Sequence, residues 1–525
     1  MTAVSPGRRT LALAVVCGTL LTVSPEGRQA GERPARTLLQ EAALPGLDRG
    51  LAPDSGVDVV FERRLRAERA VDTAGVPRGD YAPGALIVRF RDDTIPVRQE
   101  ALREVRGERL ARPAHADFEL MTLSAGTDPE EAAARLAAMP GVEYAQPRYR
   151  QHAMYRPNDP FYSFQWNFPA IDMERAWDIQ PGATSSVVVA VLDSGVAFRD
   201  AIVQFETQPF RVEAGGPVYP SLGVIDVPFA AAPDLGPAAR FVAPRDFIWG
   251  DDLPLDLDGH GTHVAGTIGQ ATNNGVGVAG MAFNVRLMPV KVIADVWDEA
   301  FGNDAAGTDD TVAQGIRYAA DNGAHVINMS IGRESGGAAP AVEAAVRYAV
   351  SRGVFVAIAA GNDGNGLNRP NRSADFASRI DGAVAVGAVG RGLDHAYYST
   401  TGSYVELSAP GGDARASAGG LREGGILQQM VDQDLAITWA DPPALFRAPR
   451  FDAFGYYFLQ GTSMATPHVS GFAALLRQQG ITNPAAIEAA MTQFATDRGA
   501  AGRDDEYGAG LIHPRNTLRG LGLLR

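Results

Sequence analysis

The chain has 525 residues, more than one ordinary domain, which allows two folded units together with processing segments. Its net charge of −14 argues against nucleic acid and anionic membrane as partners, because both favour basic patches. Hydrophobic residues make up 46% of the chain, so a large core is possible, and soluble protein substrates remain compatible with the charge.

The first 30 residues have the pattern of a secretory signal peptide. Arg8-Arg9 precede an apolar stretch from Leu11 to Val23 that is short for a membrane span. A twin-arginine signal and a lipid anchor on Cys17 are alternatives that fit the local sequence less well. We therefore expect a secreted protein, extracellular or periplasmic, with no membrane association after signal removal. Because Cys17 is the only cysteine, the mature chain would contain no disulfide.

Residues 31–80 are rich in Arg, Ala, Gly and Pro, and we expect them to form a poorly structured linker or pro-region. Residues 81–152 then predict a small α+β domain. Its expected elements, in chain order, are a strand over 85–90, a helix over 97–110, a strand over 118–123, a helix over 128–139 capped by Asp128, and a strand from residue 142. The order approaches a ferredoxin-like β-α-β-β-α-β pattern, with an unrelated α+β module as the alternative.

Residues 153–525 alternate apolar strands with helices. We expect strands over 187–192, 285–292, 326–330, 354–359 and 383–389, and helices over 263–271, 310–321, 341–351 and 463–477. This alternation predicts an α/β fold in which a parallel β-sheet is sandwiched by helices.

Three polar motifs lie at the ends of these elements. The apolar strand Val187–Leu192 ends in Asp193-Ser-Gly, and Asp258-Gly-His-Gly-Thr-His places His260 before a helix of small residues. The stretch Gly461-Thr-Ser-Met-Ala-Thr-Pro-His-Val-Ser-Gly places Ser463 at a helix start, where its own backbone N–H is unpaired and can face an oxyanion. Asp, His, Ser is one of the chain orders in which hydrolytic triads occur.

These motifs resemble the signature blocks of the subtilisin-like serine proteases, the subtilases. Asn328-Met-Ser-Ile-Gly and Val354–Asn362 are similar to the family's substrate-binding strand and oxyanion asparagine. The resemblance runs from about Asn158 to Leu518, and Tyr155–Tyr162 looks like the mature amino terminus of thermitase-like members. Against the family pattern, residues 202–239, 294–305 and 413–456 are insertions, which we expect to form surface loops.

The resemblance implies a serine endopeptidase that forms an acyl-enzyme on Ser463. His260 would take the serine proton, Asp193 would orient and stabilise the imidazolium, and Asn362 would donate its amide to the oxyanion. The residues implied in substrate binding are Ser330, Ile331, Gly332, Ala360 and Gly361. For three neighbouring polar residues, Asp258, His263 and His468, we expect structural hydrogen bonding.

Substrate preference stays open at this stage. Asp363 follows Asn362 and could favour a basic substrate residue, or it could be a solvated turn aspartate. Asp309 and Asp310 stand where the family usually shapes a pocket with apolar or aromatic side chains, so the family's common preference for a large apolar residue there is in doubt.

The resemblance also implies a structural calcium ion. The stretch Asn273-Asn-Gly-Val-Gly-Val resembles the family's strong calcium loop, and oxygen ligands suit this cation. The implied ligands are Asp159, the Asn274 side chain and the carbonyls of Ala271, Val276 and Val278. Asp200 is the candidate for a further carboxylate, and an asparagine-rich turn without metal is the alternative.

By resemblance, residues 81–152 are an inhibitory propeptide that assists folding and lays its carboxyl end across the active site. Cleavage between about Tyr149 and Tyr155 would release the mature enzyme. We therefore expect a monomeric, self-processing zymogen that acts on proteins and peptides, with its own propeptide as intramolecular inhibitor. A catalytically silent scaffold that binds peptides is the alternative, and a peptide ligase on the same fold is a third.

Overall fold

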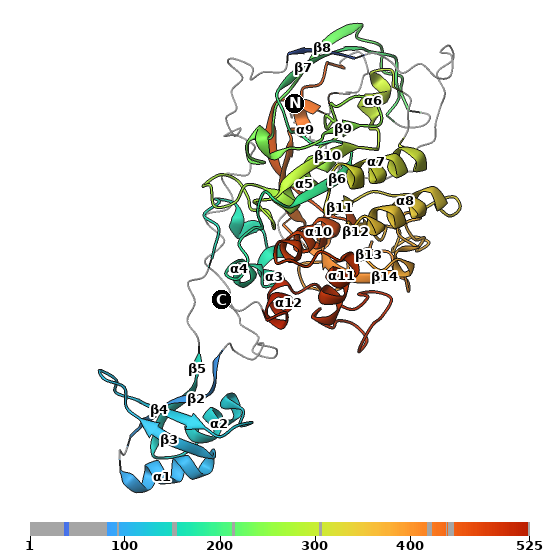
Figure 1. Ribbon diagram of the computed structural model, residues 1–525. Helices are drawn as coiled ribbons and strands as arrows, with labels where there is room; N and C mark the ends of the chain where they lie inside the picture. The colour runs from blue at the N-terminus through green and yellow to red at the C-terminus, as the bar shows by residue number, and fades with distance from the viewer. Residues whose placement is uncertain are drawn as a thin grey trace, which may run out of the picture. The chain divides into compact units, whose positions relative to one another are not determined.

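The computed structural model describes residues 36–40, 81–91, 94–149, 155–212, 216–303, 307–416, 423–436, 438 and 446–522. They belong to two compact units, one within Val59–Met154 and the other composed of Met1–Asp58 and Tyr155–Arg525 (Figure 1). The predicted signal peptide, Cys17 and the stretch 150–154 at the predicted cleavage site lie outside the described residues. Within the described ranges, no helix combines the length and apolar character needed to cross a membrane.

The smaller unit is a four-stranded antiparallel sheet with two helices. Its elements are β2 (Tyr81–Phe90), α1 (Ile95–Glu104), β3 (Gly107–Ala111), β4 (Glu119–Leu123), α2 (Pro129–Ala137) and β5 (Val142–Tyr149). The strand order β3-β4-β2-β5 follows the ferredoxin-like pattern. As predicted, Asp128 caps α2, and its carboxylate accepts from the backbone N–H groups of Glu130 and Glu131.

The predicted helix over 97–110 was too long. Residues 107–111 leave the helix and pair with β4, so they supply the second strand of the unit. The sequence Gly-Glu-Arg-Leu-Ala has no strong preference of its own, and pairing with a neighbouring strand decides its conformation.

The larger unit contains a seven-stranded sheet in the order β14-β13-β12-β11-β6-β10-β9, and all its described pairings are parallel. The strands are β6 (Val188–Asp193), β9 (Arg245–Asp246), β10 (Arg286–Lys291), β11 (Val326–Met329), β12 (Phe355–Ala359), β13 (Ala383–Val389) and β14 (Val405–Pro410). The helices are α3 (Asn167–Ala170), α4 (Met173–Trp177), α5 (His260–Gly269), α7 (Asp309–Asp321), α8 (Pro340–Ser351), α10 (Thr462–Gln478), α11 (Pro484–Gln493) and α12 (Pro514–Gly520). The predicted parallel sheet between helices is confirmed.

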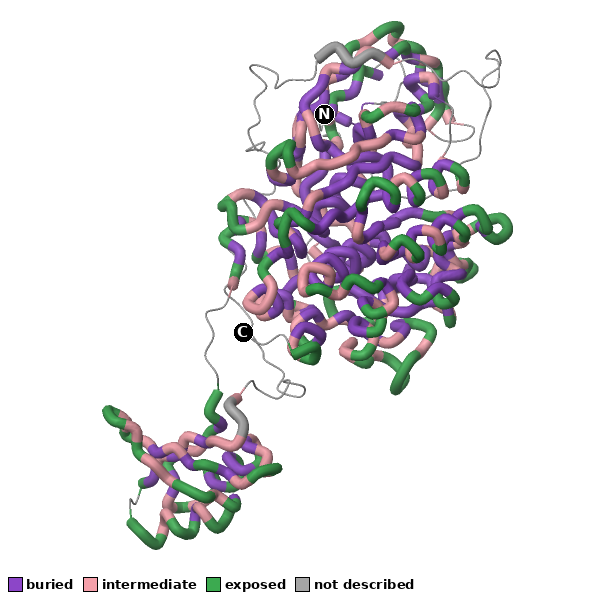
Figure 2. Tube along the Cα trace, viewed as in Figure 1, coloured by how far each residue is buried: buried purple, intermediate pink, exposed green. Residues whose placement is uncertain are grey.

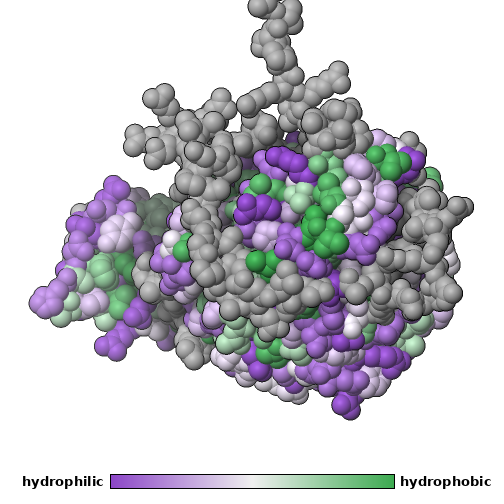
Figure 3. Space-filling view, turned by 90° about the horizontal axis from the view of Figure 1, so that it is seen from above, coloured by the Kyte–Doolittle hydropathy of each residue, from purple (hydrophilic) through white to green (hydrophobic). Residues whose placement is uncertain are grey.

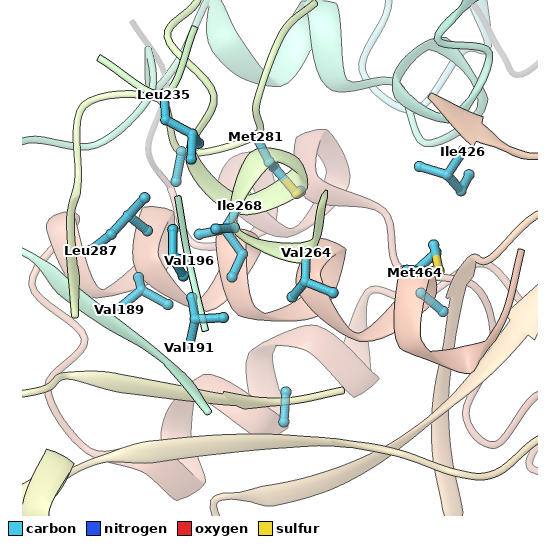
Figure 4. Packing of buried hydrophobic residues seen from close by; sticks show 14 of the residues in the cluster. Val189, Val191, Val196, Leu235, Val264, Ile268, Met281, Leu287, Ile426 and Met464 are labelled. Atoms are coloured by element: carbon cyan, nitrogen blue, oxygen red, sulfur yellow. The ribbon is translucent and has the colours of Figure 1, made fainter. Parts of the chain in front are cut away.

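Strand β6 shows why its sequence is an unbroken apolar run. Val189 and Val191 belong to the hydrophobic cluster formed with α5 and α10, whereas Leu192 belongs to the cluster formed with α7 and α8. Alternate side chains therefore enter opposite faces, and all six residues of the strand are buried. Figure 4 shows the first of these faces, where the valines of β6 lie near Val264 and Ile268 of α5. The purple centre of the tube in Figure 2 marks the same buried layer.

The three insertions pack against one another, contrary to the expectation of separate surface loops. They contain β7 (Ala201–Glu206), β8 (Val224–Phe229), α6 (Val296–Ala300), β15 (Ile426–Val431), α9 (Gln433–Ala436) and β16 (Phe454–Leu459). Aromatic rings join them: Phe205 stacks on Phe301 with ring centroids 4.0 Å apart, and Phe210 lies 5.3 Å from Phe446. We call the described residues of 201–239, 295–303 and 446–456 the insertion lobe, which lies at the top of Figure 1.

The insertion lobe has a buried hydrophobic core of its own, so its segments are not simply surface loops. Trp297 is 1% exposed, and its ring contacts Phe210, Phe301, Phe446 and Phe451, which come from all three insertions. Seen from above in Figure 3, the coloured outer surface mixes hydrophilic and hydrophobic side chains. Burial of aromatic surface contributed by distant segments is what holds the lobe together.

Five residues of the predicted linker are also structured. Strand β1 (Thr37–Gln40) pairs antiparallel with β7, which gives a three-stranded sheet in the order β1-β7-β8. The expectation of a poorly structured stretch over 31–80 is therefore wrong for residues 36–40, because the insertion lobe offers them a strand edge.

Candidate active site

Asp193 and His260 form a short hydrogen bond. Nδ1 of His260 lies 2.7 Å from Oδ1 of Asp193, which is fully buried and also accepts from the Ser194 N–H at 2.8 Å. Burial lowers the pKa of His260, but the carboxylates of Asp193, Asp258 and Asp256 together outweigh burial and raise the pKa to about 9. Because Asp193 occupies Nδ1, the other ring nitrogen, Nε2, remains available for proton transfer.

Close backbone packing places these two residues together. Asp193 ends strand β6, and His260 is the first residue of α5. Gly261 follows the histidine, and a Cβ at that position would lie 2.0 Å from the carbonyl oxygen of Gly195. A glycine is therefore required where the start of α5 approaches the loop after β6.

Ser463 is the second residue of α10, and Pro467, four residues later, leaves the Ser463 carbonyl without its helical hydrogen-bond donor. Proline has no N–H, so it cannot make the helical hydrogen bond to the residue four positions earlier. The Ser463 carbonyl instead accepts from the Ser330 hydroxyl at 2.7 Å. The Ser463 hydroxyl donates to the Ser330 carbonyl at 3.0 Å, and none of the described hydrogen bonds joins it to His260.

The Asn362 side chain has a defined orientation. Its Oδ1 accepts from the backbone N–H of Thr462 at 2.9 Å and from the Thr462 hydroxyl at 3.0 Å. A backbone N–H can only donate, so the atom facing it must be the amide oxygen. Among the described residues, neither Nδ2 of Asn362 nor the N–H of Ser463 has a hydrogen-bond partner, so two donors are left for an incoming oxyanion.

The predicted substrate-binding residues lie on two neighbouring segments. Ser330, Ile331 and Gly332 follow the end of β11, and the backbone groups of Gly332 have no partner in the described part of the chain. Ala360 and Gly361 follow β12, which pairs with β11 in parallel. Both segments therefore leave the sheet side by side at the carboxyl ends of their strands.

Asn371 joins these two segments and was missed in the sequence. Its Nδ2 donates to the carbonyls of Ile331 at 3.0 Å and Ala359 at 2.7 Å. A Cβ on Gly332 would lie 1.9 Å from the Asn371 side chain, so the glycine makes room for this cross-link. Asn371 comes from an irregular polar loop, and nothing in the local pattern distinguishes it from a surface asparagine.

Two acidic residues considered for substrate selection are paired with arginines. Asp309 accepts from Nε and Nη2 of Arg333 at 3.0 and 2.8 Å. Asp363 accepts from Nε of Arg369 at 2.8 Å, and this ion pair lowers its pKa. Asp310 accepts from the Thr308 hydroxyl. The charges of Asp309 and Asp363 are therefore largely compensated within the protein.

The other polar residues of the motifs make structural contacts. Nε2 of His263 lies 3.0 Å from the Ile426 carbonyl, and burial lowers its pKa to about 3. Nδ1 of His468 lies 2.9 Å from the carbonyl of Met464, and burial lowers its pKa to about 4. Both rings are therefore neutral at ordinary pH, and Asp258 accepts from the His260 backbone N–H at 2.9 Å.

The predicted calcium loop is folded around two buried carboxylates. Asp159 accepts from the Asn273 N–H at 2.8 Å, and Asp234 accepts from the Asn274 side chain at 2.8 Å and the Val278 N–H at 3.1 Å. Burial raises the pKa of Asp234 to about 7, and the nearby Asp159 charge adds to this rise. No cluster of three or more His, Cys, Asp or Glu side chains suited to a metal occurs in the described ranges.

Asp234, and not Asp200, is the second carboxylate at this loop. Asp200 instead accepts from the backbone N–H of Ala231 at 3.0 Å. Asp234 lies in the first insertion, so a search of the residues just after Asp193 could not find it. Two buried carboxylates that repel each other fit an oxygen-coordinated cation, whereas Asn274 turns its amide nitrogen to Asp234 and its Oδ1 accepts from the Val276 N–H at 2.8 Å.

Comparison with known proteins agrees with this geometry. Residues 184–510 match the subtilase family, and residues 67–148 match the fervidolysin N-terminal prodomain. A thermophilic serine proteinase of Bacillus sp. (strain AK1) is 30% identical over 433 residues, covering 82% of this chain and 86% of that protein. Thermitase of Thermoactinomyces vulgaris is 32% identical over 327 residues, covering 62% of this chain and 87% of thermitase.

A solved structure titled as proteases from Pseudoalteromonas arctica PAMC 21717 is 28% identical, with a TM-score of 0.49, and covers 69% of this chain and 99% of that one. Together, the family match over the larger unit and the prodomain match over the smaller one account for both units of the structure. The chain belongs to the subtilase family, as a thermitase-like serine endopeptidase with an N-terminal prodomain.

Proposed function

We propose that the chain is a secreted zymogen that processes itself and hydrolyses peptide bonds through an acyl-enzyme on Ser463. The observation that carries the proposal is the Asp193–His260 hydrogen bond of 2.7 Å, together with two unused donors, the Ser463 N–H at the start of α10 and Nδ2 of Asn362 after β12. Helices α5 and α10, which bear the histidine and the serine, pack against each other.

In the proposed reaction, Nε2 of His260 takes the Ser463 proton while Oγ bonds to the substrate carbonyl carbon. The resulting oxyanion accepts from the Ser463 N–H and from Nδ2 of Asn362. His260 then gives its proton to the leaving amine, and the acyl ester remains on Ser463. A water molecule repeats the sequence: it loses a proton to Nε2, attacks the ester, and Ser463 recovers its proton.

The serine must turn before this reaction begins. Its hydroxyl donates to the Ser330 carbonyl in this structure, so the hydrogen bond to His260 has to replace that contact. Catalytic hydrogen bonds of free enzymes often form fully only when substrate is bound. The Asp193–His260 pair is already in place and needs no such change.

We infer that the substrate binds as an extended peptide along Ser330–Gly332, with Ala360 and Gly361 opposite. The free backbone groups of Gly332 suit pairing with a peptide strand. Asn371 would keep the two segments at a fixed separation. Because Asp309 and Asp363 are paired with arginines, we do not assign them a preference for basic substrate residues.

We assign a structural calcium ion to the loop after α5. Asp159 and Asp234 would hold it, and the Asn274 side chain would join them after its amide turns to present Oδ1 in place of Nδ2. The carbonyls of Ala271, Val276 and Val278 would complete the oxygen shell. The cation would offset the repulsion between two buried carboxylates. Its role would be to fix the loop, and no step of the proposed reaction depends on it.

The remaining assignments concern processing and location. Residues 1–30 would direct secretion, and residues 81–152 would assist folding and inhibit the enzyme until cleavage between 149 and 155. The mature enzyme would act as a monomer on proteins and peptides, and its acidic charge would disfavour nucleic acid.

A comparison of wild type with Ser463→Ala tests the proposal against a catalytically silent, peptide-binding scaffold. On a denaturing gel, the purified wild-type chain should be shortened by roughly its first 150 residues, whereas Ser463→Ala should stay full length. Ser351→Ala, which removes an exposed hydroxyl at the end of α8, should process like wild type. Equal processing of wild type and Ser463→Ala would refute the assignment, and no processing of either would favour the silent scaffold.

A further inference from the structure

Arg36 is buried inside the larger unit although it precedes the prodomain in sequence. Its side chain is 2% exposed and its guanidinium lies over the Trp249 ring, 4.8 Å from the centroid. Nε and Nη2 donate to the two oxygens of Asp251 at 2.9 and 2.7 Å, and Nη2 also donates to Asp246 at 2.8 Å and to the Leu253 carbonyl at 2.5 Å. Nε and Nη2 are thus bound by two carboxylates and a carbonyl, while the buried Nη1 has no hydrogen-bond partner among the described residues.

The partners of Arg36 are ordered independently of it. The Asp246 carboxylate accepts from the backbone N–H groups of Ile248 and Trp249 at 2.8 and 2.9 Å, which closes a tight turn. Strand β9, which contains Asp246, pairs in parallel with β10. The acceptors of Arg36 therefore belong to the edge of the central sheet, whereas the arginine itself comes from a distant segment of the chain.

Charge balance in this buried cluster depends on Arg36. Lys291 is fully buried and pairs with Asp298 at 2.9 Å, and Asp246 is also fully buried. Without Arg36, the single positive charge of Lys291 would face two buried carboxylates. Removing one partner from a buried ion pair leaves an uncompensated charge, which is strongly destabilising.

The cluster also contacts the loop that carries the catalytic aspartate. The ammonium group of Lys291 donates to the Ser194 carbonyl at 2.9 Å, and Ser194 follows Asp193 directly. Loss of Arg36 therefore affects a lysine that holds the backbone beside the triad.

Strand pairing adds a second attachment. Residues 37–40 form β1, which covers one edge of β7 while β8 covers the other. Without β1, the backbone groups along that edge of β7 would lose their partners. An arginine anchor followed by a short extended strand is how a peptide adds to a sheet.

We propose that residues 36–40 stay bound to the catalytic unit as a non-covalent strand after the prodomain is cut off, so that the processed enzyme consists of two chains. The inference rests on the proposed cleavage between 149 and 155, which puts Arg36 and Ser463 on different chains. Covalent connection through the prodomain is not needed, because the arginine site and the edge of β7 both belong to the larger unit.

An experiment with an added protease keeps this test independent of self-processing. Full-length Ser463→Ala receives two recognition sequences for a site-specific protease, one within 41–80 and one within 150–154. After cutting, size-exclusion chromatography under native conditions is followed by mass spectrometry of each fraction. The fragment containing Arg36 should elute with the catalytic unit, and its separation from that unit would overturn the proposal.

Two variants test whether Arg36 is the anchor. Arg36→Met should release the fragment, whereas Arg245→Met should not, because Arg245 pairs with Asp252 on the exposed side of the same short strand. Retention of the Arg36→Met fragment would refute the anchoring role. Circular dichroism of the uncut variants checks that both fold.

A peptide measurement gives the same answer without relying on the folding of a variant fragment. A fluorescein-labelled peptide of residues 31–42 is titrated onto cut Arg36→Met protein after its own fragment has separated. The peptide should bind saturably, and the same peptide with citrulline at position 36 should bind about 100-fold more weakly, because citrulline keeps the shape but not the charge. Equal affinity of the two peptides would overturn the proposal.

Discussion

Asn362→Asp is the sharpest test of the oxyanion arrangement. The aspartate carboxylate can still accept from the backbone N–H and the hydroxyl of Thr462, but it has no amide hydrogen to donate. Loss of one oxyanion donor lowers kcat by about 10²–10³, or about 2.7–4 kcal/mol, a value taken from subtilisin, which belongs to the same family. Because the lost interaction strengthens in the transition state, kcat should fall far more than KM changes.

Asn362→Ala separates the chemical effect from the structural one. Alanine removes the same donor, but it also leaves the buried Thr462 N–H without its acceptor, which should cost about 1–3 kcal/mol of unfolding free energy. Asn362→Asp should keep more of this stability than Asn362→Ala. Chromogenic peptide hydrolysis gives kcat and KM, and thermal unfolding gives the stability difference, on protein cut at the prodomain junction by an added protease.

A matched asparagine provides the control. Asn284 is exposed, bonds to backbone carbonyls, and lies before the amino end of β10, opposite the sheet edge that carries the triad. Asn284→Ala should leave kcat unchanged. If a folded Asn362→Asp kept wild-type kcat, the assignment of Nδ2 as an oxyanion donor would be refuted.

Three further predictions concern cations and protons. Chelation should lower the melting temperature of the processed enzyme, because a ligand bound only to the native state adds about 2.7 kcal/mol at a concentration of 100 Kd, and Asp234→Asn should reduce this response. The value of kcat/KM should rise with pH, with a midpoint near 9, because only the neutral imidazole of His260 accepts the serine proton. Burial lowers the pKa of His260, but the carboxylates of Asp193, Asp258 and Asp256 together raise it more. Burial, with repulsion from Glu488, raises the pKa of Glu406 from 4.5 to about 8, so between these pH values the folded state retains a proton that the unfolded state loses. The free energy of unfolding should therefore fall as pH rises from about 4.5 to 8, and Glu406→Gln should make this fall smaller.

Each of these predictions has its own check. A melting curve that chelation leaves unchanged would remove the metal assignment, and magnesium in place of calcium controls for ionic strength. A midpoint of kcat/KM near pH 6.5 would mean that the neighbouring carboxylates do not raise the pKa of His260. For Glu406, denaturant unfolding at several pH values gives the slope directly, and Glu343→Gln, at an exposed ion pair on α8, serves as the comparison because its pKa is shifted downward.

The central sheet and the three catalytic motifs were accessible from local sequence. The apolar run ending in Asp193 predicted a strand buried on both faces, and all residues of β6 are buried. The glycine-led turn at Gly461 predicted a helix start, and α10 begins at Thr462. Such patterns are local, since burial on a strand or the start of a helix is set by residues a few positions apart.

Contacts between distant segments were not accessible in this way. Asn371 and Asp234 sit in irregular stretches, and their importance depends on Ile331 and Asn274, which lie 40 residues away in each case. Strand β3 was assigned to a helix because its own residues do not specify the pairing with β4. The aromatic residues of the three insertions were visible, but their common core was not.

By itself, the sequence determined the order Asp193, His260, Ser463, the alternation that makes a parallel sheet, and the family to which these belong. Only the tertiary structure decided that the insertions form one lobe and that Arg36 is buried beside strand β9 at the edge of the central sheet. A single arginine in a polar stretch has the pattern of a solvated residue. It becomes an anchor because folding brings it to Asp246 and Asp251, which are 210 and 215 residues away along the chain. Periodicity records whether a residue is buried within its own element, whereas the partner that makes burial of a charge favourable is supplied by another part of the chain.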